Sequence, residues 1–221
     1  MDLSLSDEQK QLQESAERFV RDKYTFENRR KIAATEKGWL AENWAQFAEL
    51  GWLAIPFSEE DGGIGFGSIG SMIVMEQFGK GLVLEPFLPT VVLGGGMIAA
   101  AGTAPQKEAL LAPMIEGKKQ FALAWLERQS RYNLADVSLK ATKEGNGWSL
   151  SGQKGVVYNA ASADNIIVLA RTAGSAREEK GLTLFVVDGK AKGITRRDYP
   201  TQDAQRASEI LQVAINPPVL S

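Results

Sequence analysis

The 221-residue sequence contains no cysteine and no histidine. The missing cysteine excludes disulfide bonds and thiol nucleophiles, and the two absences together exclude zinc sites built from these side chains. Without histidine, a general base must be a carboxylate, a lysine or a tyrosine. The chemistry of this chain therefore depends on those side chains, on hydroxyl groups or on a bound organic cofactor, and no metal site is predicted.

Strong charge and long hydrophobic segments are also missing. The net charge is -2, the isoelectric point is about 5.4, and the densest basic cluster, Arg29-Arg30-Lys31, falls in a helical pattern. Neither nucleic acid nor an anionic membrane is therefore expected as a partner. The apolar stretch at residues 91–101 is interrupted by Gly94-Gly95-Gly96 and is too short to span a bilayer. Because residues 1–10 lack a signal-peptide pattern, a cytoplasmic location is expected.

The first half of the sequence has the periodicity of amphipathic helices. Ser6 and Gln9 have the spacing of a capping box, so a helix is expected to begin there. Further helices are predicted at residues 90–101 and from Thr103 onward. Three apolar stripes predict helical faces, namely Leu12, Ala16, Phe19 and Val20; Leu40, Trp44, Phe47 and Leu50; and Ile69, Met72, Ile73, Met75 and Phe78.

From Phe121 onward, short apolar runs separated by turns predict antiparallel β-structure. The strands are predicted at residues 121–126, 137–142, 148–151, 166–171, 182–187, 194–199 and 210–215. Asn146-Gly147 between two of these runs predicts a hairpin. We therefore predict an α+β fold, in which an all-helical domain of residues 1–118 precedes an antiparallel, β-barrel-like domain of residues 119–221.

Few motifs indicate chemistry by themselves. The glycines of residues 62–67 are spaced like part of a nucleotide-binding loop, but a helix precedes them, so a plain loop is favoured. Gly94-Gly95-Gly96 indicates either close helix packing, which is favoured, or room for an elongated ligand. Glu127 and Tyr158-Asn159 each end an apolar strand. They are interpreted as salt-bridge or turn residues, or alternatively as parts of a site.

Several segments resemble the acyl-CoA dehydrogenase family. ELGWLAIP at residues 49–56 and EEDGGIG at residues 59–65 are similar to the family's ELGWLGLPxPEEYGGLG. MEQFG at residues 75–79 resembles its EELG, and NGWSLSGQK at residues 146–154 resembles its GDGYVLNGxK. The two following strands also match, so the resemblance covers nearly the whole chain in the right order. Residues 130–134 and 160–172 are most similar to the small-subunit type of pimeloyl-CoA dehydrogenase.

The resemblance implies FAD-dependent oxidation of an acyl-CoA substrate to the 2-enoyl-CoA. In this family a glutamate removes the α-proton while a hydride leaves the β-carbon for the flavin, and the acyl chain lies between helices. An electron-transfer flavoprotein or a similar acceptor is the implied redox partner, and a homo- or hetero-oligomer is expected.

The resemblance also implies site residues. Trp125-Leu126-Glu127 takes the place of the family's Thr-Glu-Pro, and Val156 takes the place of a tryptophan beside the flavin. Ser130 and Arg131 replace the family's GSGSD segment and are the expected substrate-binding residues. The implied cofactor-binding residues are Trp125, Leu126, Glu127, Val156, Val157, Tyr158 and Asn159.

No catalytic residue is assigned within the sequence. The family keeps its catalytic glutamate in a C-terminal helical domain, and no such domain follows Ser221. The chain is therefore expected to be a truncated dehydrogenase that is inactive alone. The alternative is a non-catalytic acyl-CoA-binding or partner subunit of a complete dehydrogenase, and a less favoured one is a related flavin reaction such as monooxygenation.

Overall fold

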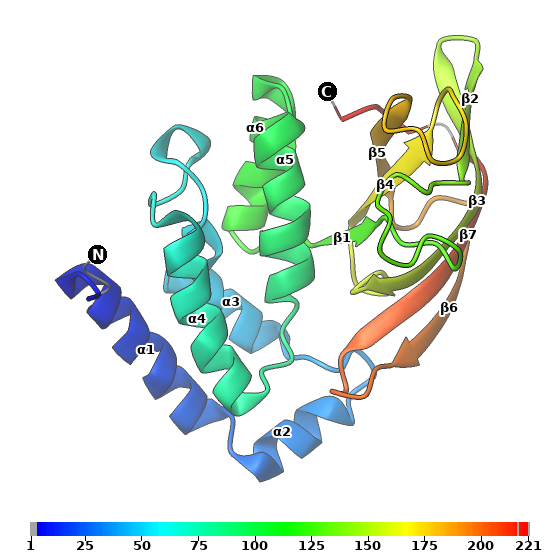
Figure 1. The fold of residues 1–221 in the computed structure, drawn as a ribbon. Coiled ribbons are helices and arrows are strands. Elements are labelled where there is room, and N and C mark those ends of the chain that lie inside the picture. Colours follow the sequence, from blue (N-terminus) through cyan, green and yellow to red (C-terminus); the bar gives the residue numbers. More distant parts are fainter. Residues whose placement is uncertain (1–3, 216, 221) are drawn as a thin grey trace.

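The computed structural model describes residues 4–215 and 217–220, and places the helices beside a sheet (Figure 1). The helical elements are α1 (Asp7–Lys23), α2 (Phe26–Ala33), α3 (Ala41–Glu49), η1 (Trp52–Ala54), η2 (Glu59–Asp61), α4 (Gly67–Gly81), η3 (Leu88–Gly95), α5 (Gly96–Ala101) and α6 (Ala104–Ile115). The strands are β1 (Phe121–Ala124), β2 (Lys140–Glu144), β3 (Gly147–Tyr158), β4 (Asn165–Arg171), β5 (Leu182–Asp188), β6 (Ile194–Pro200) and β7 (Arg206–Ile215).

Local sequence signals fix where several helices begin. The amide of Gln9 donates to Ser6 Oγ over 3.3 Å, and Ser6 N donates back to Gln9 Oε1 over 3.0 Å, which confirms the predicted capping box. A second capping box, between Thr103 and Gln106, begins α6. None of the described helices has the length and apolar character needed to cross a membrane.

The segment predicted as an ordinary helix at residues 90–101 begins instead as the π-helix η3 and continues as α5. Its glycines allow close packing. A Cβ atom on Gly94 would lie 2.5 Å from Cβ of Phe121, and one on Gly95 would lie 2.6 Å from Cζ of Phe57. The packing interpretation is therefore confirmed for these two glycines, whereas nothing lies within 4 Å of a Cβ on Gly96.

The sheet has the order β1-β4-β2-β3-β7-β6, with β5 paired to β4. The α+β prediction is confirmed, but the sheet is mixed. Strand β4 pairs with β5 in antiparallel orientation, with β1 in parallel orientation, and with β2 at Lys140↔Arg171, also parallel. In the part of the chain that the structure describes, the strands do not close into a barrel. The predicted antiparallel pairing therefore holds for β2, β3, β7 and β6 and for the pair of β4 and β5, whereas the barrel-like closure is not observed among the described strands.

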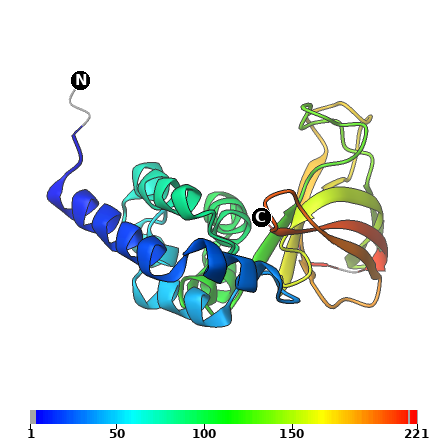
Figure 2. The same cartoon turned by 90° about the horizontal axis from the view of Figure 1, so that it is seen from below.

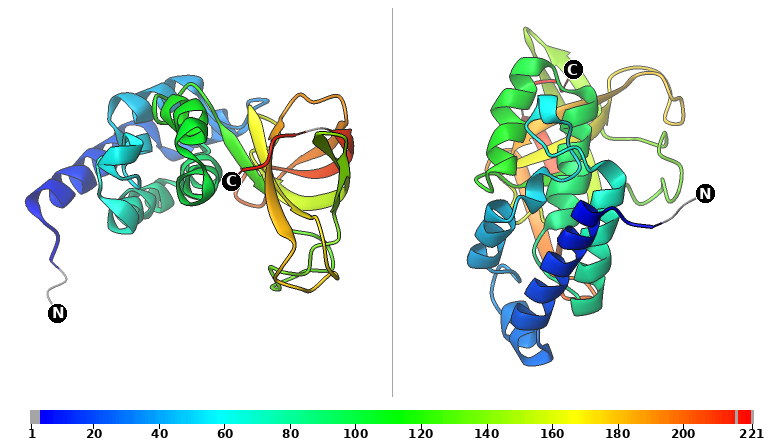
Figure 3. Two further views of the ribbon diagram at one scale, coloured as in Figure 1. Left: turned by 90° about the horizontal axis from the view of Figure 1, so that it is seen from above. Right: turned by 90° about the vertical axis from the view of Figure 1, so that its left-hand side faces the viewer.

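Two hydrophobic clusters lie on opposite sides of the central strands. The first joins the helices to the sheet, because Phe121, Ile167 and Val186 belong to the same cluster as the helical core. The second lies within the sheet and includes Phe185 and Leu150. Figures 2 and 3 show the helices together against one side of the sheet. Burial of this apolar surface stabilises the contact between helices and sheet.

Two arginines add polar contacts across the same junction. Arg206, on β7, donates from Nη2 to the backbone oxygens of Ala33 and Thr35 over 3.0 and 2.9 Å. Arg29, on α2, donates to the backbone oxygen of Asp203 over 2.6 Å. The turn between β6 and β7 is therefore attached to α2 and to the segment that follows it.

Candidate functional site

A β-bulge interrupts strand β3 near its end. Lys154 pairs with Ile210 and Val157 pairs with Ser208, so Gly155 and Val156 together face one residue of β7. Val156 has φ of 51° and is 41% exposed. A β-branched residue rarely adopts this left-handed conformation, and such strain is found most often at functional sites. The bulge thus presents a strained, exposed residue on the surface of the sheet.

The segment after β1 lies directly beside this bulge. The amide of Gly155 donates to the backbone oxygen of Leu126 over 2.9 Å. Lys154 Nζ donates to the backbone oxygen of Trp125 over 3.2 Å. Trp125 and Leu126 are half-buried. The structure therefore brings together the two predicted cofactor-binding segments, which are separated by about 30 residues in sequence.

Glu127 is buried and its carboxylate accepts four hydrogen bonds. Lys154 Nζ donates to Oε1 over 2.8 Å and Gln129 Nε2 donates to Oε2 over 2.7 Å. The amides of Ser138 and Leu139 donate the other two, over 2.8 and 3.0 Å. Because a carboxylate has about four acceptor positions, that of Glu127 is fully occupied. Its side chain is therefore a salt-bridge partner and is not available as a base or as a ligand.

The Lys154–Glu127 ion pair is shielded from solvent, since the side chain of Lys154 has no exposed surface and that of Glu127 has 4%. Burial disfavours ionisation of Glu127, but hydrogen bonds from Lys154 and Gln129 outweigh it and lower the pKa of the carboxyl group. Burial also lowers the pKa of Lys154, and Glu127 opposes that change. The pair thus depends on its own hydrogen bonds to remain ionised.

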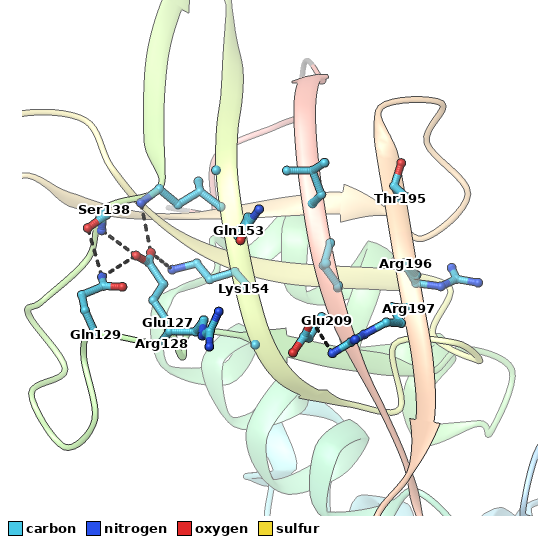
Figure 4. A pocket seen from close by; sticks show the side chains of 15 residues that line it. Glu127, Arg128, Gln129, Ser138, Gln153, Lys154, Thr195, Arg196, Arg197 and Glu209 are labelled. Atoms are coloured by element: carbon cyan, nitrogen blue, oxygen red, sulfur yellow. Dashed lines mark hydrogen bonds and ion pairs between the residues drawn. The ribbon is translucent and has the colours of Figure 1, made fainter.

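A cavity of about 400 Å³ lies between this ion pair and the exposed side of β7 and β6 (Figure 4). Arg128 and Arg197 line it, and Arg197 Nη2 lies 2.9 Å from Oε2 of Glu209. Gln153 and Thr195 supply further polar groups. Among the described residues, no group of three or more acidic side chains is placed to hold a metal ion. The cavity offers guanidinium and amide donors to an anionic ligand.

The other predicted cofactor-binding residues differ in accessibility. Val157 is completely buried in the sheet cluster, whereas Tyr158 is half-buried. Asn159 is buried, and its Nδ2 donates to Thr90 Oγ1 and to Gln120 Oε1 over 3.4 and 3.3 Å. The side chain of Asn159 therefore connects the end of β3 to η3 and does not face the cavity.

The two predicted substrate-binding residues also lie in different surroundings. Ser130 is buried, and its Oγ donates to the backbone oxygen of Glu127 over 2.8 Å while accepting from the amide of Glu127 over 3.1 Å. Arg131 is exposed and has φ of 47°. Only Arg131 therefore has a side chain free to reach a ligand, and neither residue lines the cavity.

Sequence reasoning missed two residues of this region, Lys154 and Tyr199. Tyr199 pairs with Ala207, which in turn pairs with Tyr158. Burial and the charge of Glu209 raise the pKa of Tyr199, while a hydrogen bond from the backbone N–H of Val156 opposes that rise. The phenol of Tyr199 therefore lies at the bulge. Only Lys154 had a sequence signal, because it occupies a strand position that faces the interior.

Comparison with known proteins gives consistent results. Residues 6–118 match the family described as "Acyl-CoA dehydrogenase, N-terminal domain", and residues 122–216 match "Acyl-CoA dehydrogenase, middle domain". The chain is 34% identical to a 3-(aryl)acrylate reductase of Clostridium sporogenes over 68% of this chain and 40% of that protein. It is 30% identical to the mitochondrial isovaleryl-CoA dehydrogenase of Pongo abelii, over 86% of this chain and 46% of that protein.

Solved structures show the same fold. A variant of the Tcur3481-Tcur3483 steroid ACAD matches with a TM-score of 0.87 and 28% identity, covering 99% of this chain and 58% of that one. A glutaryl-coenzyme A dehydrogenase matches with a TM-score of 0.84 and 24% identity, covering 100% and 58%. The chain thus spans less than half of its curated relatives and somewhat more than half of these structures. With both family segments matched in order, the chain belongs to the acyl-CoA dehydrogenase family.

Proposed function

We propose that this chain forms the flavin-facing part of an FAD-dependent acyl-CoA dehydrogenase that interconverts an acyl-CoA and its 2-enoyl-CoA. The observation that carries the proposal is the ordered match of two acyl-CoA dehydrogenase segments over residues 6–118 and 122–216. The bulge at Gly155 and Val156 supports it, because the family resemblance implies a flavin-facing residue at Val156 and this residue is exposed.

The residues around the bulge suit FAD in their chemistry. Trp125, Leu126 and Tyr158 are half-buried and Val156 is exposed, so aromatic and apolar side chains are accessible to a ring system. The adjoining cavity contains Arg128 and Arg197, whose guanidinium groups suit a diphosphate. When bound, FAD supplies hydride acceptance and donation. The chain's own residues would orient the ring through the bulge and exclude water from one of its faces.

No catalytic base is proposed among the described residues. The buried carboxylates are those of Glu85, Asp136 and Glu127. Those of Glu85 and Glu127 are each engaged by several hydrogen bonds, and that of Asp136 is paired with Arg177 over 2.9 Å. We propose that the base comes from polypeptide that these residues do not include. This agrees with relatives of which the chain covers 40% and 46%. On this proposal, the 221 residues bind ligands but do not turn them over.

The names of the relatives supply two candidate acyl groups, each with its own direction of reaction. One relative is a dehydrogenase of isovaleryl-CoA and another is a reductase of 3-(aryl)acrylates. Both reactions change the oxidation level of a Cα–Cβ bond. An electron-transfer flavoprotein or a similar acceptor is the proposed redox partner.

A second candidate function is that of a non-catalytic subunit. It is supported by a solved structure of the same fold that is described as the ChsE4-ChsE5 complex from Mycobacterium tuberculosis and covers 98% of this chain. On this alternative, the chain binds acyl-CoA or a dehydrogenase partner without binding FAD. The two candidates therefore differ in their affinity for the flavin.

The experiment is a titration of the purified chain with FAD, followed by flavin fluorescence, and then an assay of turnover. Isovaleryl-CoA and 3-phenylpropanoyl-CoA are supplied with an artificial electron acceptor, and their enoyl products with a reductant. FAD binding without turnover is the expected result. Turnover would contradict the assignment of the base to other polypeptide. Absence of FAD binding, with acyl-CoA still bound, would favour the non-catalytic subunit.

A further inference from the structure

The feature that carries a further inference is the position of Lys154 between two ligand-facing segments. It lies immediately before the Gly155-Val156 bulge, and its ammonium group reaches across to the segment that follows β1. There it donates to the backbone oxygen of Trp125 over 3.2 Å and to Oε1 of Glu127 over 2.8 Å. A third bond, from the amide of Gly155 to the oxygen of Leu126 over 2.9 Å, runs beside these two.

A fully buried lysine is unusual at a strand position that faces the protein interior. Lys154 pairs with Ile210 and faces the same side of the sheet as Val157. Ile210 and Val157 are both buried apolar residues. Removing two charges from water costs free energy that their attraction repays only with good geometry. Apolar residues at both positions 127 and 154 would fill the same space without that cost. Stability alone therefore does not account for the lysine.

What the lysine adds is a fixed register between the bulge and the segment at Trp125. An apolar side chain would pack against this segment but would not bond to a particular carbonyl. The carboxylate of Glu127 is itself held by the amides of Ser138 and Leu139 and by Gln129. The lysine is therefore anchored to a rigid acceptor, and its contact with Trp125 sets one relative position of the two segments.

The bulge requires such a support. Val156 has a left-handed backbone conformation, which is strained for a β-branched residue and persists only where the surroundings impose it. The bonds from Lys154 and Gly155 to the neighbouring segment fix the residues immediately before Val156. Without them, a relaxed backbone at Val156 would turn its side chain and amide away from their present directions.

We propose that Lys154 is a positioning residue for the flavin, which fixes the Gly155-Val156 bulge against Trp125-Leu126 and so preforms the surface on which the ring lies. The inference rests on the proposed function. It predicts that loss of the ammonium group reduces affinity for FAD by more than the accompanying loss of stability can explain. It assigns the lysine no contact with substrate and no part in proton transfer.

The test compares Lys154→Met with a variant of similarly reduced stability at a distant site. Met keeps the length of the side chain but donates no hydrogen bond. Leu111→Ala, in the helical core, is the matched control, because Leu111 is 1% exposed on α6, which packs against α5, η1, η2 and η3, and its truncation destabilises the fold there. Both variants are titrated with FAD well below their unfolding temperatures, and the visible absorption spectrum of the bound flavin is recorded.

The expected result is affinity at least about tenfold weaker and an altered flavin spectrum for Lys154→Met, with Leu111→Ala like the unaltered chain. Equal affinity and equal spectra in the two variants would overturn the inference. If Lys154→Met does not fold, Lys154→Gln replaces it, because its neutral amide keeps two N–H donors in place of the three of the ammonium group, on a side chain that is one atom shorter. Its FAD affinity should then be intermediate, and unaltered affinity would again overturn the inference.

The unaltered chain separates this inference from the proposed function. If that chain binds FAD and the Lys154 variants bind it equally well, the inference is wrong and the proposed function stands. If the unaltered chain does not bind FAD, the flavin part of the proposed function is wrong, and the inference is overturned with it. The two failures are thus observed in different proteins.

Discussion

The phenol of Tyr24 donates a hydrogen bond to the carboxylate of Glu85, which lies 61 residues further along the chain. Asn43 Nδ2 and the amide of Leu40 donate to the other oxygen, over 2.9 and 3.4 Å. Glu85 therefore joins the end of α1 to α3 and to the segment before η3. Burial raises the pKa of Glu85 above its ordinary value of 4.5, and the hydrogen bonds only partly oppose it.

This raised pKa makes folding stability depend on pH. The folded chain holds the proton of Glu85 more tightly than the unfolded chain does, so the free energy of unfolding should fall as pH rises above 4.5. Glu85→Gln keeps an acceptor for Asn43 and cannot ionise. The variant should lack this part of the decline, as measured by urea unfolding at a series of pH values. Parallel curves for the two proteins would contradict the prediction.

Replacing Arg171 by lysine, which keeps the positive charge, is expected to lower the stability of the fold strongly. Its guanidinium group donates to six backbone oxygens, those of Val137, Ala173, Lys180, Ala135, Ala176 and Glu178. Lysine has three donors in one place and cannot span the two loops that supply these oxygens. Arg171→Lys should therefore lose about 2–4 kcal/mol in urea unfolding. Arg18→Lys, on the exposed side of α1, should change stability little.

Replacing the strained Val156 by glycine is expected to increase the stability of the fold. Glycine adopts a left-handed conformation without steric cost but loses more backbone entropy on folding. Relief of strain should exceed this loss, so Val156→Gly should stabilise the chain by about 1 kcal/mol. Val156→Ala keeps a Cβ atom at φ of 51° and serves as the control, with a smaller gain. Equal stability of the valine and glycine proteins in thermal unfolding would show that the bulge is not strained.

The guanidinium groups that line the cavity are expected to strengthen FAD binding by an electrostatic attraction that salt weakens. Arg128→Gln and Arg197→Gln should each weaken FAD binding by about three- to tenfold at low salt, because each removes a positive charge from the cavity that is proposed to take the diphosphate. The difference from the unaltered chain should shrink as salt screens these charges. Arg18→Gln, on α1, is the charge-matched control. An effect of the control as large as that of the cavity variants would mean that net charge alone is responsible.

Some of the fold could be predicted because the signals are local. Ser6 and Gln9 cap α1 within a few residues of one another. The hairpin forms where the Asn-Gly signal predicts one, although Glu144 pairs with Gly147, so that Gly145-Asn146 makes the turn. The parallel pairing of β1 with β4 joins Phe121 to Asn165 and is not encoded by any turn. One signal for it was present. The uninterrupted apolar run at residues 166–170 is typical of a strand buried on both faces.

The site was harder to predict than the fold. The family resemblance found both segments, at Trp125 and at Val156, but their hydrogen-bond partners depend on long-range pairing. The bulge arises because β7 supplies one residue where β3 supplies two, and neither strand shows this alone. The role of Glu127 depends on Lys154, 27 residues away. A lysine at an interior strand position was the available clue, since a buried lysine requires a partner.

The hydrophobic core shared by helices and sheet restricts which amino-acid substitutions this chain can tolerate. Phe121, Ile167 and Val186 pack into the helical cluster. Position 94 has room only for glycine, because a Cβ atom there would lie 2.5 Å from Cβ of Phe121. A larger residue on the helical side of this contact would require a smaller residue on the facing strand, and the reverse also holds. The two family segments are therefore expected to diverge together. A chimaera that joins the helices of one relative to the sheet of another should fold poorly unless these facing residues are exchanged as a set.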